Sequence, residues 1–80
     1  YEAEKQLQKQ RRKIEKLIEQ SEQTVAELES AISALEDIMS TPEGSTQHNF
    51  EKYAALKKQL SEAESEWEQN MEQLENLEAV

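Results

Sequence analysis

Thr41-Pro42-Glu43-Gly44 interrupts a chain that otherwise repeats apolar residues at intervals of three and four positions. Pro42 and Gly44 are the only proline and the only glycine among the 80 residues. A proline pushes the residue before it out of the helical region, and a glycine tolerates a sharp change of chain direction. We therefore expect one helix on each side of this tetrapeptide.

Two rows of residues, one on each side of the break, carry the repeat. The first seam consists of Leu7, Arg11, Ile14, Ile18, Ser21, Val25, Leu28, Ile32, Leu35 and Met39. The second seam consists of Tyr53, Leu56, Leu60, Ala63, Trp67, Asn70, Leu74 and Leu77. A mean step of about 3.5 residues holds one narrow stripe against a partner helix. The pattern predicts an all-α fold, a two-helix antiparallel coiled-coil hairpin.

The hairpin is expected to be a single domain that occupies the whole chain. Thr46 or Asn49 is expected to cap the second helix. The chain opens in mid-pattern without a methionine, so we expect a domain excised from a longer protein. The predicted domain covers residues 1–80, with helix 1 over about 3–40, a loop over about 41–48 and helix 2 over about 49–78.

Charge is distributed in blocks that favour the antiparallel arrangement. Residues 1–20 carry a net charge of +2 and residues 21–39 carry −5, whereas residues 50–60 carry +2 and residues 61–80 carry −7. Folding at the break places the basic start of helix 1 beside the acidic end of helix 2. The total of −9 argues against tight, nonspecific nucleic-acid binding by the hairpin as a whole.

The two seams also predict a register in which each layer of one meets a layer of the other. Large residues then face small ones, with Trp67 over Ser21 and Val25 over Ala63, which avoids overpacking. At the open end the same register pairs Arg11 with Leu77. We expect Trp67 to be part of the core rather than a platform on which bases stack.

A row of basic residues runs down one face of helix 1. One interpretation is a stripe that follows the phosphates of DNA or structured RNA. The alternative is charge pairing with the acidic second helix, which we favour from the sequence because complementary partners lie in the same chain. The candidate nucleic-acid-binding residues are Lys5, Lys9, Arg12, Lys13 and Lys16.

Other classes of site lack their sequence requirements. There is no cysteine and only one histidine, His48, so we expect no metal site, and one glycine cannot form a phosphate-cradling loop. The longest apolar runs are too short for a membrane span or a signal peptide, so we expect no membrane partner. We predict no catalytic residue and no enzyme activity for this chain. A further alternative is weak self-association through apolar residues that flank the seams and widen the apolar stripe, namely Leu17, Ile38, Phe50 and Met71.

Several segments together resemble a known family. They are the basic opening over residues 9–16, the pattern Ile38-Met39-Ser40-Thr41-Pro42 at the break, and Glu66-Trp67-Glu68 late in helix 2. Over nearly its whole length the chain resembles the C-terminal coiled-coil domain of ABC-F ATPases, soluble ATP-binding-cassette proteins that include Uup-type members.

The resemblance implies a function that the residues alone do not. It implies a cytoplasmic parent with two ATPase domains that bind ATP and Mg²⁺, and no cofactor in this chain. ABC-F proteins are mostly ribosome-associated translation factors, and the tail of Uup-type members is described as DNA-binding. The expected function is therefore a non-catalytic domain that helps to position its parent on DNA, ribosomal RNA or the ribosome. The alternative is a structural or protein–protein interaction coiled coil without nucleic-acid contact.

Overall fold

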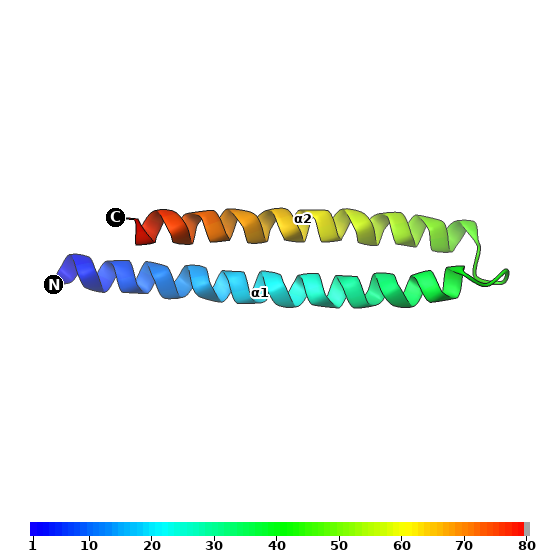
Figure 1. The fold of residues 1–80 in the computed structure, drawn as a ribbon, viewed down its shortest axis with the longest axis horizontal. Coiled ribbons are helices and arrows are strands. Elements are labelled where there is room, and N and C mark those ends of the chain that lie inside the picture. Colours follow the sequence, from blue (N-terminus) through cyan, green and yellow to red (C-terminus); the bar gives the residue numbers. More distant parts are fainter. Residues whose placement is uncertain (80) are drawn as a thin grey trace.

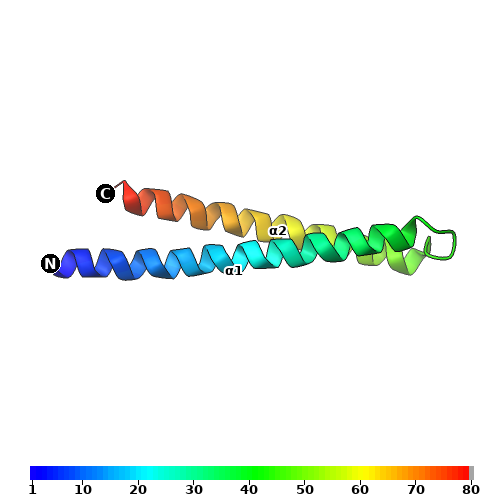
Figure 2. The ribbon, with the colours of Figure 1, turned by 60° about the horizontal axis from the view of Figure 1, so that its bottom comes forward.

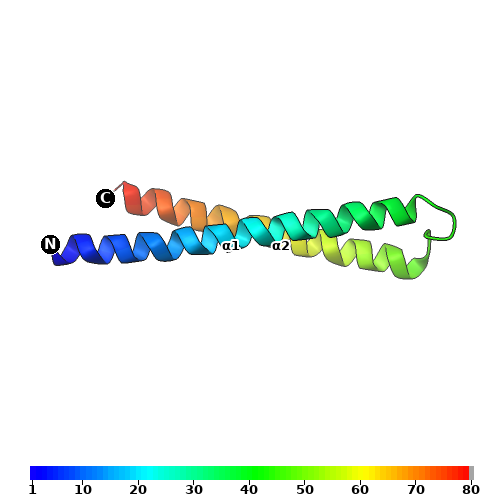
Figure 3. The same ribbon diagram turned by 90° about the horizontal axis from the view of Figure 1, so that it is seen from below.

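The chain forms two long helices, α1 (Glu2–Met39) and α2 (Gln47–Glu78), in a computed structural model that describes residues 1–79 (Figure 1). The helices lie side by side and antiparallel, so that both chain ends are at one end of a rod measuring 64 × 15 × 14 Å. The helices cross near the middle of the rod in the view of Figure 3 and nearer the loop in the view of Figure 2. The predicted all-α antiparallel hairpin is confirmed. Val80, the last residue of the predicted domain, lies outside the described residues.

The core is a line between the helices rather than a volume. Every buried or half-buried side chain of α1 belongs to the first seam, and Ile32 and Leu35 are the least exposed at 5%. Of the second seam, Ala63 is buried and the other members are half-buried. No large side chain of residues 1–79 is wholly enclosed, because each helix covers only one face of its partner.

Arg11 is the one member of the first seam that remains exposed, with 55% of its side chain accessible. Its guanidinium bonds Glu15 within α1 at 3.1 Å and Glu78 of α2 at 3.1 Å. A long basic side chain can lay its aliphatic stem along an apolar seam while its charged head stays in water. Arg11 was predicted to lie opposite Leu77, and it forms its ion pair with the residue that follows Leu77, which is Glu78.

Two contacts between the helices test the predicted register. The Trp67 indole N–H donates to a Glu22 carboxylate oxygen at 3.2 Å, and Arg11 reaches Glu78. The prediction placed Trp67 beside Ser21 and Arg11 beside Leu77, so both contacts agree with it to within one residue. A slip by one heptad would separate both pairs by about 10 Å.

The break is a compact turn that is closed by short hydrogen bonds. The Thr41 hydroxyl donates to the Ile38 carbonyl at 2.7 Å and accepts from the Gly44 N–H at 3.1 Å. The Ser45 hydroxyl donates to the Met39 carbonyl at 2.8 Å. Gly44 is buried, and a Cβ at this position would clash with the Ile38 carbonyl and lie 2.8 Å from Ile38 Cγ2. Glycine is needed at this position because the backbone lies so close to Ile38. Its backbone conformation is not the reason, since its φ is not positive.

Helix α2 begins at Gln47, two residues before the predicted start at residue 49, so the loop predicted over 41–48 ends at Thr46. Of the two predicted caps, Thr46 is correct, since its side chain accepts from the Asn49 N–H at 3.1 Å. Asn49 lies inside the helix, and its side-chain amide donates to the Gly44 carbonyl at 2.9 Å. Thr46 therefore caps α2, and Asn49 links the first turn of α2 to the loop.

Candidate functional site

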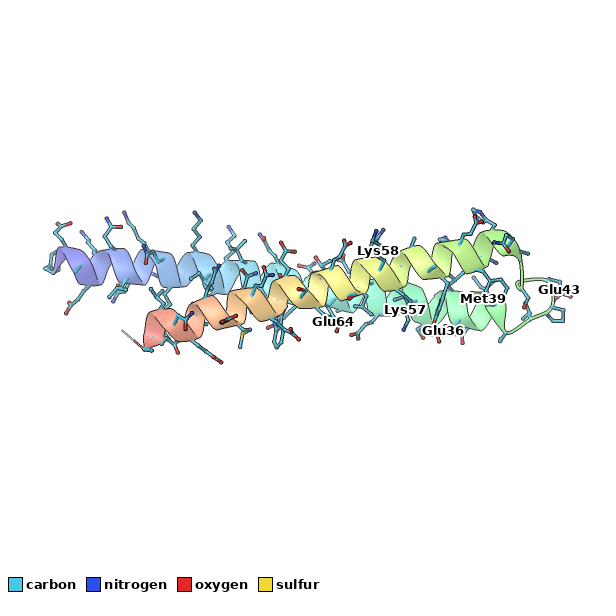
Figure 4. The ribbon with its side chains drawn as sticks, turned by 90° about the horizontal axis from the view of Figure 1, so that it is seen from above. Glu36, Met39, Glu43, Lys57, Lys58 and Glu64 are labelled. Carbon is cyan, nitrogen blue, oxygen red and sulfur yellow. The ribbon has the colours of Figure 1, made fainter. Side chains whose placement is uncertain are left out.

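The five candidate nucleic-acid-binding residues all lie exposed on the first half of α1. We call this set the cationic stripe: Lys5, Lys9, Arg12, Lys13 and Lys16. In a heptad written abcdefg with the seam at a and d, the stripe occupies positions b, c and f. These positions point away from the partner helix, whereas e and g flank it. Figure 4 shows several nitrogen-tipped side chains on the side of this segment that faces away from α2.

The stripe does not pair with α2, contrary to the interpretation that we favoured from the sequence. Within residues 1–79, both ion pairs involve Arg11, which lies on the seam and not in the stripe. The Lys5 ammonium lies 5.4 Å from the centre of the Tyr1 ring, a cation–π contact with the residue that precedes α1. Pairing fails because the outer face of one helix cannot reach the other helix, so these five charges are turned toward solvent.

The outer faces of the two helices carry opposite charge at the open end of the hairpin. On α2 the outward positions c, f and b carry Glu62, Glu72 and Glu75, all exposed. Because the outer faces of two packed helices point in opposite directions, the glutamates lie across the rod from the cationic stripe. The net charge of −9 is therefore a poor guide to the potential that a ligand meets at the stripe.

A second surface feature lies on one edge of the seam, near the middle of the rod. An open groove of about 340 Å³ has Val25 and Trp67 at its base and four glutamates at its rim. Trp67 lies on the seam, where its ring is half-buried and its indole N–H donates to Glu22, so it is only partly enclosed by the helices and also lines this groove. We call this set the acidic groove: Val25 and Trp67 with Glu22, Glu29, Glu64 and Glu68.

This groove was not predicted, although the sequence carries a signal for it. Position e of the heptad on α1 is occupied by Glu15, Glu22, Glu29 and Glu36 in succession. Position e flanks the seam, and antiparallel helices place the e positions of both partners on the same edge. Figure 4 shows Glu64, Lys57 and Glu36 on one side of the hairpin, with Lys58 on the other.

Residues 1–79 were also compared with the requirements of metal sites and membrane spans, and His48 is the one histidine to consider. His48 is exposed at the start of α2. Within residues 1–79, no three histidine, cysteine, aspartate or glutamate side chains are grouped so that they could hold a metal ion. Neither described helix contains an apolar stretch of the length needed to cross a bilayer.

Comparisons of this chain with protein-family models, curated proteins and solved structures found no match. The resemblance to the ABC-F C-terminal domain therefore stays a prediction.

Proposed function

We propose that this hairpin is a non-catalytic arm that binds nucleic acid through the cationic stripe and positions a larger protein on it. The observation that carries the proposal is the orientation of the stripe. All five cations point away from α2, and none makes an ion pair within the described part of the chain. Cations that are not neutralised within the molecule can release the counterions of a phosphate backbone when they bind it.

The dimensions of the stripe suit a nucleic-acid backbone. From Lys5 to Lys16 the rise along α1 is about 17 Å, which equals about five base pairs of a duplex. A straight helix presents these charges in a row, so it can lie along a groove edge without bending. The apolar residues of the same segment lie in the seam, where they hold α1 against α2.

The resemblance to the ABC-F C-terminal domain supports the class of partner. It suggests DNA, ribosomal RNA or the ribosome, with ATP and Mg²⁺ bound by ATPase domains elsewhere in a cytoplasmic parent. In this proposal the hairpin binds the nucleic acid or ribosome, and the ATPase domains of the parent bind and use ATP.

The test is a titration of the hairpin against labelled duplex DNA and structured RNA at about 50 mM and about 200 mM salt. Two variants remove three lysines each and so change the net charge equally. One is K9Q/K13Q/K16Q in the stripe, and the matched control is K52Q/K57Q/K58Q near the loop. We expect the stripe variant to bind at least about tenfold more weakly and to lose up to about 2.7 from the slope of log affinity against log salt. The control is expected to retain both values.

Equal losses in the two variants would contradict the proposal, because the effect would then follow total charge and not the stripe. Absence of binding by the wild-type hairpin would contradict it as well. Circular dichroism of all three proteins must show equal helicity, since glutamine and lysine have similar helix propensities. A stripe that binds nothing would leave the hairpin as a spacer or a protein-docking arm.

A further inference from the structure

The acidic groove is a surface that neither the nucleic-acid proposal nor the stability of the fold explains. Four carboxylates at its rim repel the phosphates that the cationic stripe attracts. No basic residue within residues 1–79 forms an ion pair with any of them. Like charges gathered around an apolar base lower stability, so their arrangement points to an external partner of opposite charge.

The base of the groove is apolar and aromatic. Val25 and Trp67 lie between the rim residues of the two helices, and the indole N–H bond to Glu22 fixes the orientation of the Trp67 ring. The lysine on the same edge, Lys57, does not fill this space. Its ammonium lies 5.7 Å from the centre of the Tyr53 ring, one turn nearer the loop.

An aromatic base with a carboxylate rim matches the chemistry of an arginine or lysine side chain. The aliphatic stem packs on Val25 and the indole, the cationic head can lie over the ring, and the carboxylates accept its hydrogen bonds. A bare metal ion fits less well, because no three of the carboxylates are grouped for coordination within the described residues. An anionic or purely apolar partner would bury the glutamates without compensation.

We propose that the acidic groove docks a basic peptide segment of a partner protein, with an arginine or lysine side chain laid over Val25 and Trp67 between the four glutamates. Charge complementarity selects this occupant, and the volume of about 340 Å³ gives room for a long side chain. The site lies on a different face from the cationic stripe, so the inference does not depend on nucleic-acid binding. The hairpin then presents one surface to phosphate and another to basic protein.

The fluorescence of Trp67 can be used to follow binding at this site. Trp67 is its only tryptophan, so a change in indole fluorescence reports the groove. The probe is a capped hexa-arginine peptide, titrated into the full hairpin while Trp67 emission is recorded. We expect saturable binding accompanied by a change in the intensity or wavelength of that emission.

Two variants with equal net charge separate the groove from general attraction to an acidic protein. The groove variant is E29Q/E64Q/E68Q, which spares the Glu22 bond to Trp67. The matched control is E27Q/E62Q/E72Q, which removes three exposed glutamates that do not line the groove. We expect the groove variant to bind at least about tenfold more weakly than the wild type, and the control to stay within about twofold.

Three outcomes would overturn the inference. They are an equal loss of affinity in the two variants, binding without any change in Trp67 emission, and absence of binding by the wild-type hairpin. None of these outcomes bears on the nucleic-acid titration, which reads a different face of α1. Failure of one proposal is therefore distinguishable from failure of the other.

Discussion

The loop half of the hairpin and its open half share one seam but are held in different ways. In the loop half, residues 28–60, the seam includes Ile32 and Leu35, and the turn is tied by side-chain bonds from Thr41, Ser45 and Asn49. In the open half, residues 2–27 and 61–78, the seam includes the buried residues Ile18, Ser21 and Ala63, and the helix ends are joined by the exposed bridge from Arg11 to Glu78. Both halves therefore contain buried seam residues, and they differ at their ends. The loop end is closed by a hydrogen-bonded turn, whereas the open end carries an exposed ion pair, and both candidate binding surfaces lie in or next to the open half.

Truncation of one leucine in each half provides the strongest test of this difference. Leu35→Ala is expected to lower the free energy of unfolding by about 2–3 kcal/mol, because it removes a side chain that is 5% exposed and leaves a gap in the seam. Leu77→Ala, at a half-buried position near the open end, is expected to cost about 1 kcal/mol. Urea unfolding followed by circular dichroism measures both. Equal losses would show that the two halves are equally well packed.

The turn itself is tested by Gly44→Ala. A methyl group at this position meets the Ile38 carbonyl, so the turn must shift, and we expect a loss of about 1–2 kcal/mol in the free energy of unfolding. The control is Glu43→Ala, which alters an exposed neighbour and should change stability by less than about 0.5 kcal/mol. Thermal melts compare the two variants. A Gly44→Ala protein as stable as the control would mean that the turn relaxes freely and does not anchor the loop half.

The smallest expected effect concerns the ion pair of the open half. A double-mutant cycle with Arg11→Ala and Glu78→Ala should give a coupling energy of about 0.2–1 kcal/mol, because both side chains are about half exposed to water. Added salt should reduce it further. The measurement is the unfolding free energy of the four proteins at low and high salt. A coupling that exceeds this range and resists salt would show that the open end is held more firmly than its exposure suggests.

The residues that sequence reasoning placed correctly are those whose environment is fixed by local spacing. Heptad steps assigned the seam, and the interhelical contacts of Arg11 and Trp67 agree with the predicted register. The start of α2 was misplaced by two residues, because Thr46 and Asn49 are both good caps and only the turn decides between them. The residues of the cationic stripe were identified correctly as one row, but their expected pairing with the glutamates of α2 was wrong. Charge composition matched it to α2, whereas its heptad positions turn it away.

The sequence by itself determined that two helices form, where they break and which residues line the seam, because these depend on periodicity and on one proline and one glycine. Only the tertiary structure decided which charges meet. Whether a lysine reaches a glutamate depends on the direction in which each side chain leaves its helix. The same packing joined Val25 and Trp67, from different helices, at the base of one groove. Amino-acid composition carries no information about that direction, which in this hairpin separates the charges that pair within the fold from those that face solvent.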